Sequence, residues 1–109
     1  MDAIEELATI FKALSDPTRL RLFKLLEEQP VGGCPDACNG RAFLCVNALA
    51  QQLGVTQSAV SQHLRVLRQA GLVRGVRHGS FVHYTLDPEG LARYKAILVE
   101  TLGERWTSP

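Results

Sequence analysis

All three cysteines of the chain, Cys34, Cys38 and Cys45, lie within twelve consecutive positions of its 109 residues. Thiolates are soft ligands that bind thiophilic metal ions, and they are also the groups that oxidants modify. The odd number of cysteines argues against a framework of disulfides, so we expect free thiols in a reducing compartment. Three uses stay open on these grounds: metal binding, redox sensing, and burial as small hydrophobic residues.

The composition is that of one small globular domain. The chain is 46% hydrophobic and 21% charged, which suffices for a single core but not for two. The amphipathic start MDAIEELATIFK lacks the basic and apolar regions of a secretory signal, which favours a cytoplasmic location. Polar residues interrupt the uncharged stretch 42–64, so we expect no membrane-spanning helix. The prediction is one domain over residues 1–109.

The charges are segregated along the chain. The segment 37–86 contains five arginines and no acidic residue, a net charge of +5. The rest of the chain carries seven basic and eleven acidic side chains, a net charge of −4. A basic half of this kind favours a surface that faces a polyanion, although a solvated row of arginines has the same composition.

The first thirty residues predict two helices. Asp2 has the position of a cap for a helix over 2–14, whose apolar residues recur at helical spacing. Asp16-Pro17 is a typical start for a second helix, because Asp accepts free N–H groups and Pro is tolerated at the first helical position. The second helix has a broad apolar side formed by Leu20, Leu22, Phe23, Leu25 and Leu26. We therefore expect this helix to be central to the core.

Residues 46–70 have the pattern of a helix-turn-helix. A short helix from Val46 to Leu53 is followed by Gly54, and Thr56 caps a longer helix that extends to Ala70. The longer helix has one apolar stripe, formed by Val60, Leu64 and Leu67. Its other side is polar and consists of Ser58, Ser61, Gln62, Arg65, Arg68 and Gln69. Such a helix fits the DNA major groove, where these side chains hydrogen-bond to base edges and phosphates.

The C-terminal part predicts a hairpin and a last helix. Residues 72–86 are rich in β-branched and aromatic side chains around His78-Gly79, which indicates a β-hairpin with a basic tip. Asp87-Pro88 repeats the pattern of cap and proline, and apolar residues at helical spacing define a helix over 88–106 that includes Trp106. The fold class is therefore mainly α with a β-hairpin wing, a winged helix-turn-helix.

Two stretches resemble the ArsR/SmtB family of winged helix-turn-helix repressors, ALSDPTRLRLFKLL and LAQQLGVTQSAVSQHLRVLRQAGLVRGVRHGSFVHYTL. The likeness covers about residues 4–100, and the run SQHLRVLRQAGLV before a hairpin is its specific part. The resemblance implies a homodimer that binds double-stranded operator DNA and leaves it when an inducer ion binds. The dimerisation helices are expected over 2–14 and 88–106, because their apolar stripes exceed what a small monomer can cover.

The resemblance also implies which residues face the DNA. The helix that follows Thr56 enters the major groove in such proteins, which places Gln57, Ser58, Ser61, Gln62 and His63 near bases. Arg65 and Arg68 are expected nearer the phosphates, and the wing residues Arg77 and His78 near the backbone or the minor groove. Two alternatives stay open: Arg68 as a surface ion-pair residue, and His63 as a residue that packs against the wing.

The family resemblance favours arsenic(III) or antimony(III) as the ion bound by the three cysteines. Where some family members carry Cys-x-Cys, this chain has Cys45-Val46-Asn47, and Cys34 and Cys38 lie just upstream. If Pro35 begins a helical turn, Cys34 and Cys38 share one face, and nearby glycines let the loop return to Cys45. Three thiolates suit a pyramidal arsenic or antimony centre, whereas zinc in a structural site prefers four ligands.

Other functions have less support in the sequence. The stretch 88–106 contains no histidine, so the zinc or nickel site that some family members carry there is missing. A redox sensor, an iron–sulfur cluster, or a site for cadmium, lead, mercury or zinc stays an alternative use of the cysteines. No catalytic motif is present, and we expect no enzyme activity, organic cofactor or small organic substrate.

Overall fold

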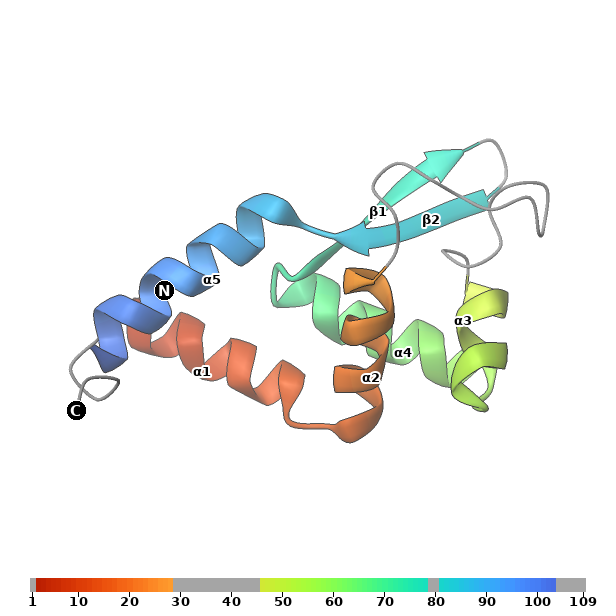
Figure 1. The fold of residues 1–109 in the computed structure, drawn as a ribbon, viewed down its shortest axis with the longest axis horizontal. Helices are drawn as coiled ribbons and strands as arrows, with labels where there is room; N and C mark the ends of the chain where they lie inside the picture. Colours follow the sequence, from red (N-terminus) through yellow and green to blue (C-terminus); the bar gives the residue numbers. More distant parts are fainter. Residues whose placement is uncertain (1, 29–45, 79–80, 104–109) are drawn as a thin grey trace.

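The computed structural model describes residues 2–28, 46–78 and 81–103, and these ranges form five helices and one hairpin (Figure 1). The elements are α1 (Ala3–Leu14), α2 (Pro17–Glu27), α3 (Val46–Leu53), α4 (Gln57–Gln69), β1 (Val73–His78), β2 (Phe81–Leu86) and α5 (Pro88–Leu102). This order confirms the predicted one of four helices, a hairpin and a last helix. The three cysteines lie outside the described residues.

Aspartate caps begin three of the helices. The side chains of Asp2, Asp16 and Asp87 each accept hydrogen bonds from backbone N–H groups in the first turn that follows. Pro17 and Pro88 come next in α2 and α5, where the missing N–H costs nothing because the first turn has no intrahelical acceptor for it. These starts are the predicted ones.

The core is formed mainly by leucine and valine side chains from several elements. Its fully buried members are Leu22, Leu49, Val60, Leu64, Leu67, Leu72 and Val73. Leu22 and Leu26 place α2 in this core, as predicted, but Leu20 is 49% exposed, so the expected inward side of α2 was too broad. Leu20 lies two residues from Leu22, about 200° around the helix, and the two cannot face the core together.

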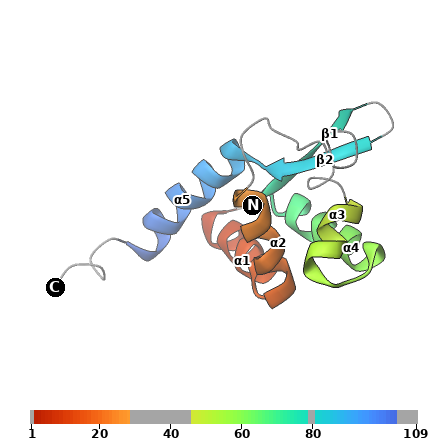
Figure 2. The ribbon, with the colours of Figure 1, turned by 45° about the vertical axis from the view of Figure 1, so that its right-hand side comes forward.

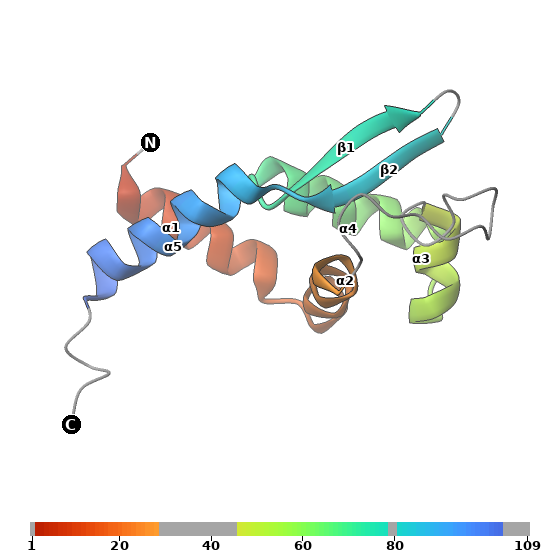
Figure 3. The same cartoon turned by 45° about the horizontal axis from the view of Figure 1, so that its top comes forward.

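The views show two regions. Helices α1 and α5 lie side by side at one end of the molecule, whereas α2, α3 and α4 form the other end, with the hairpin along one side (Figures 1 and 3). Figure 2 shows that α5 extends from the end of β2 away from α3 and α4. The arrangement separates two chain-terminal helices from a helix-turn-helix with a wing.

Glycine and threonine define the helix-turn-helix. α3 ends at Leu53, and Gly54 adopts φ +69°, a left-handed conformation that suits glycine. The hydroxyl of Thr56 then accepts a 3.0 Å hydrogen bond from the backbone N–H of Ala59. α4 ends at Gln69, one residue earlier than predicted, and Gly71 follows at φ +80°.

The wing is a two-stranded antiparallel hairpin. Its register pairs Val73 with Leu86 at one end and His78 with Phe81 at the other. The predicted wing, residues 72–86, is therefore correct to within one residue. α5 follows, but it ends at Leu102, because Gly103 takes φ +77° and its N–H bonds to the Val99 carbonyl at 2.7 Å. The predicted end at residue 106 was too late, and Trp106 lies outside the described residues.

A bidentate ion pair joins α1 to α5. The Nη2 and Nε atoms of Arg93 donate to the two carboxylate oxygens of Glu6, at 2.7 and 2.9 Å. The hydrogen bond from Arg93 holds the pKa of Glu6 below its usual value. The fork of the guanidinium matches the carboxylate, so the pair fixes an orientation as well as a distance.

The start of α5 also contacts the end of α4. The backbone N–H of Asp87 donates to the Leu72 carbonyl at 3.0 Å. Gly90 lies so close to the Gly71 carbonyl oxygen that a Cβ at Gly90 would overlap it. This contact between two backbones needs glycine at position 90, and it places α5 directly against the turn that ends α4.

We expect Arg93→Gln to remove the part of the pH dependence of stability that comes from Glu6. Because the folded pKa of Glu6 is lowered, its contribution is present above the ordinary value of 4.5 and is lost as the pH falls through the lowered value. Urea unfolding at a series of acidic pH values measures this difference. Lys95→Gln, which removes an exposed charge elsewhere on α5, is the control and should keep the wild-type profile. Parallel profiles of wild type and Arg93→Gln would contradict the assignment.

We expect Gly90→Ala to destabilise the protein, although glycine to alanine inside a helix normally stabilises by about 1 kcal/mol. The added Cβ collides with backbone at Gly71, which cannot rotate away as a side chain can. The loss should be about 1–3 kcal/mol or more in urea unfolding at fixed protein concentration. Gly54→Ala, where nothing lies within 4 Å of an added Cβ, should cost only about 1 kcal/mol for the left-handed φ. A larger loss for Gly54→Ala than for Gly90→Ala would refute this explanation.

Candidate nucleic-acid interface

The outer side of α4 is a continuous polar surface. Val60, Leu64 and Leu67 are at most 2% exposed and turn one stripe of the helix into the core. The residues on the opposite side are all exposed, and we name them the polar face of α4: Ser58, Ser61, Gln62, Arg65, Arg68 and Gln69. The structure therefore places five predicted DNA-facing residues, all of these except Gln69, on one surface.

Gln57 lies on one flank of this polar face, next to α3. The side-chain N–H of Gln57 donates to the side-chain oxygen Oδ1 of Asn47 at 2.9 Å. The amide oxygen of Gln57 accepts no hydrogen bond from the described residues, and it can accept from another donor. Gln57 is exposed, as the prediction requires, but α3 determines the direction of its side chain.

His63 lies on the other flank, next to α2. It is half-buried, and its Nδ1 is 3.4 Å from Nη1 of Arg19. Arginine has only donors, so Nδ1 is the acceptor in this hydrogen bond. The recorded contact is thus with α2, 44 positions away in the sequence.

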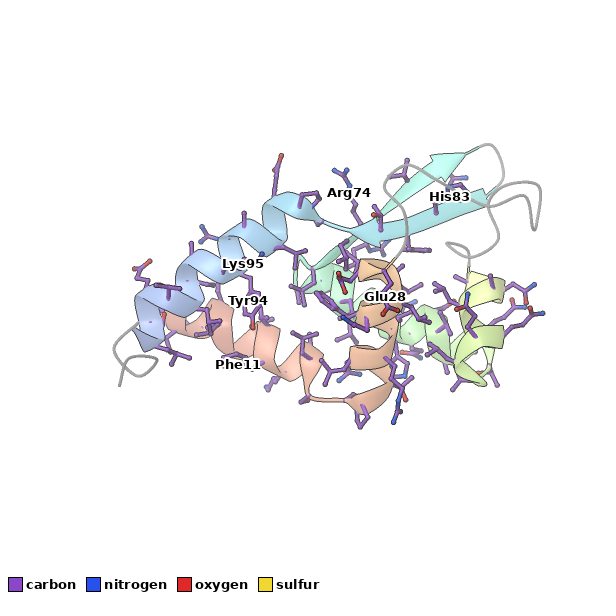
Figure 4. The ribbon with its side chains drawn as sticks, in the orientation of Figure 1. Phe11, Glu28, Arg74, His83, Tyr94 and Lys95 are labelled. Atoms are coloured by element: carbon purple, nitrogen blue, oxygen red, sulfur yellow. The ribbon has the colours of Figure 1, made fainter. Side chains whose placement is uncertain are left out.

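The wing carries two exposed arginines. Arg74 and Arg77 are both exposed on β1, and Figure 4 shows Arg74 pointing away from the helices. Arg77 is a predicted DNA-facing residue, whereas Arg74 was counted only for its charge. The backbone of His78 ends β1, but its side chain is outside the described part of the structure. His83 on β2, labelled in Figure 4, is buried, with 7% of its surface exposed.

The charged side chains from α3 to the end of β2 are all positive. From α3 to the end of β2 the sequence has arginines at positions 65, 68, 74 and 77 and no acidic residue. Three of the acidic side chains elsewhere are occupied as helix caps, at Asp2, Asp16 and Asp87. The polar face of α4 and the wing therefore form a cationic surface that suits a polyanion.

The three cysteines of the predicted thiol site are separate in the sequence from this surface. Cys34, Cys38 and Cys45 all fall in 29–45, outside the described residues. Among the residues that are described, no group of three His, Cys, Asp or Glu side chains could hold a metal ion. None of the described helices is long and apolar enough to cross a membrane.

Sequence reasoning missed two residues of this surface. Asn47 and Arg19 hold the two flanks of α4 through Gln57 and His63. A polar residue in the first turn of α3 was a weak signal for Asn47. Nothing in the sequence pattern connects Arg19 with a residue of α4, because α2 and α4 meet only in the folded chain.

Comparisons with known proteins agree with this geometry. A family described as a helix-turn-helix domain matches residues 14–76. The transcriptional repressor SmtB homolog of Synechocystis is 40% identical over 79% of this chain, and the match spans 55% of that protein. The arsenic resistance transcriptional regulator ArsR1 of Pseudomonas putida is 33% identical over 92% of this chain and 70% of its own length.

A solved structure supports the same assignment. It is the homodimeric winged helix-turn-helix DNA-binding domain Mb0332 from Mycobacterium bovis, described as a possible ArsR-family transcriptional regulator. It superposes with a TM-score of 0.62 at 26% identity and covers 91% of this chain and 79% of its own. The relatives are transcriptional regulators and not enzymes, in agreement with the prediction. By its fold, by the polar face of α4 and by its sequence, the chain belongs to the ArsR/SmtB family of winged helix-turn-helix transcriptional regulators.

Proposed function

We propose that this protein is a homodimeric repressor that binds a specific DNA operator and releases it when a thiophilic ion binds its cysteines. The polar face of α4 is the observation that carries the DNA part of this proposal. Its glutamine and serine side chains can hydrogen-bond to base edges, and its arginines can reach bases or phosphates. The exposed Arg74 and Arg77 of the wing add positive charge beside it.

The exposed apolar residues of α1 and α5 support the homodimer. Ile4 is 68% and Phe11 44% exposed on α1, and Val99 is 46% and Leu102 50% exposed on α5. Large apolar side chains gathered on two adjacent helices are typical of a protein interface. We propose that a second copy of this chain covers these apolar side chains. The resulting two-fold dimer would present two α4 helices to a palindromic operator.

Arsenite or antimonite is the inducer that we propose for Cys34, Cys38 and Cys45. Each thiol would replace one hydroxyl of As(OH)₃, forming an S–As bond and releasing water, with no change of oxidation state. The relative ArsR1 is an arsenic resistance regulator, which supports this choice of ion. Free thiols require a reducing compartment, so the proposal includes the cytoplasm as the location.

The position of Cys45 suggests how ion binding would reach the DNA. Cys45 immediately precedes α3, and Asn47 follows two residues later. Asn47 holds Gln57, the first residue of α4, through the 2.9 Å hydrogen bond. An ion that favours a different position of α3 would therefore disturb the reading helix. By linkage it must weaken DNA binding by the factor by which DNA weakens ion binding, typically 1–3 kcal/mol.

DNA binding is tested with a duplex that the wild-type protein selects from a random-sequence pool. Gln62→Ala should weaken binding to the selected duplex roughly tenfold but leave binding to random duplex nearly unchanged, because it removes a base contact. Arg68→Gln should weaken both and lower the slope of log K against log salt by about 1. Fluorescence anisotropy at several salt concentrations measures all of these quantities.

Lys95→Gln is the matched control for the DNA experiment, because it removes one exposed positive charge from α5 instead of α4 (Figure 4). Its salt slope should equal that of the wild type. If the wild-type protein selects no sequence, or if Gln62→Ala and Arg68→Gln bind like Lys95→Gln, the polar face of α4 is not the DNA-binding surface.

Ion sensing is tested by adding arsenite to the preformed complex of reduced protein and selected duplex. The wild type should release the DNA, whereas Cys34→Ser, Cys38→Ser and Cys45→Ser should each bind DNA normally and respond at least tenfold more weakly. Antimonite, cadmium, lead, mercury and zinc identify the preferred ion in parallel. A hydrogen peroxide arm without ions tests the redox alternative. If all three variants respond like the wild type, the cysteines are not the sensor.

A further inference from the structure

Arg19 of α2 connects three helices. Its Nε donates to the Ala13 carbonyl at 2.6 Å, and its Nη2 to the Lys12 carbonyl at 3.4 Å, both in the last turn of α1. Its Nη1 donates to Nδ1 of His63 on α4 at 3.4 Å. All three nitrogen atoms of the guanidinium therefore have acceptors.

The chemistry of these contacts requires arginine. The last carbonyls of a helix carry partial negative charge, so a fixed cation there is favourable, although Ser15 also donates to the Lys12 carbonyl. The planar guanidinium directs several N–H groups along different lines, whereas a lysine ammonium is a single point of charge. Asp16 accepts the backbone N–H of Arg19 at 3.2 Å, a bond that lowers the pKa of this carboxyl and fixes the start of α2.

The contact also favours one tautomer of the neutral His63 ring. Because Nδ1 accepts from an arginine that cannot accept in return, the neutral ring carries its proton on Nε2. No described residue provides an acceptor for that Nε2–H group. His63 is half-buried on the flank of the polar face of α4, and a donor at Nε2 would suit a molecule bound to that face.

We infer that Arg19 is a positioning residue for DNA recognition, which acts by fixing the side chain and tautomer of His63. The inference rests on the proposed DNA function and extends it to a residue outside the helix-turn-helix. Arg19 holds His63 with Nε2–H as the donor toward the duplex. It also ties the reading helix to the C-terminal end of α1, one of the two helices with exposed apolar faces.

The first test needs no DNA. Long-range ¹H–¹⁵N spectra of the neutral imidazole distinguish the two tautomers by the nitrogen shifts. In the wild type His63 should be an Nε2–H tautomer with a hydrogen-bonded Nδ1. Arg19→Gln should shift the Nδ1 resonance and mix the tautomers. Arg21→Gln, which removes an exposed arginine of the same helix, should leave the His63 resonances unchanged.

The second test is a double-mutant cycle on binding to the selected duplex. Arg19→Gln should lower affinity roughly tenfold in the wild-type background but have little effect in a His63→Ala background, because the two residues act as a unit. Arg21→Gln measures the effect of losing one charge alone and should have a smaller effect. Arg19→Lys keeps the charge and part of the α1 contact, so it should fold and lie between Arg19→Gln and the wild type.

The outcomes separate this inference from the proposed function. Equal losses for Arg19→Gln and Arg21→Gln, or equal losses for Arg19→Gln with and without His63, would overturn the role of Arg19 in recognition while DNA binding itself stands. An unchanged His63 spectrum in Arg19→Gln would overturn the contact itself. A wild-type protein that selects no duplex would instead refute the proposed function, and the spectra would still test the contact. Circular dichroism checks that each variant is folded before it is compared.

Discussion

The burial of one stripe of α4 is the constraint on which the polar face of α4 depends. Val60, Leu64 and Leu67 are at most 2% exposed, and burying each such side chain is worth roughly 1.5–3 kcal/mol. A rotation of the helix by one residue, about 100°, would expose this stripe and bring polar side chains into the core without partners. The rotation of α4 about its axis is therefore fixed by the packing of its buried stripe in the core. This packing alone determines which residues face outward, and DNA is not needed for it.

The position of α4 relative to α1 and α5 is fixed by a series of contacts that begins and ends at α4. Its C-terminal turn meets α5 at Gly71 and Gly90, α5 is joined to α1 by Glu6 and Arg93, and α1 returns to α4 through Arg19. Each contact alone contributes little to the free energy of unfolding, and this holds especially for the exposed ion pair between Glu6 and Arg93. Together they define one placement of α1 and α5 relative to α4. The spacing between two α4 helices in a dimer would therefore follow from how α1 and α5 associate.

The sequence predicts the elements well because their determinants are local. Asp-Pro starts, glycines at helix ends and the apolar stripe of α4 act over three or four residues, and the structure confirms them. Two local predictions were wrong because an apolar side chain was taken as evidence of structure. Trp106 extended the predicted last helix past Gly103, where α5 has already ended, and Leu20 was expected in the core but is exposed. The contacts Arg19–His63 and Asn47–Gln57 join residues 44 and 10 positions apart, and side-chain geometry alone creates them. The polar face of the candidate site was therefore predictable, whereas the contacts that hold its flanks were not.

The two flanks of α4 are held by different parts of the chain. Asn47 contacts one flank from α3, directly after the cysteine-containing segment, and Arg19 contacts the other from α2, at the end of α1. The buried stripe prevents rotation, but it restricts tilting and sliding less, because apolar contacts are not directional. Hydrogen bonds on opposite flanks supply the missing directionality. A helix restrained in this manner transmits a displacement of either neighbour to its polar face. The orientation of the polar face of α4 is thus coupled to the positions of α3 and α1.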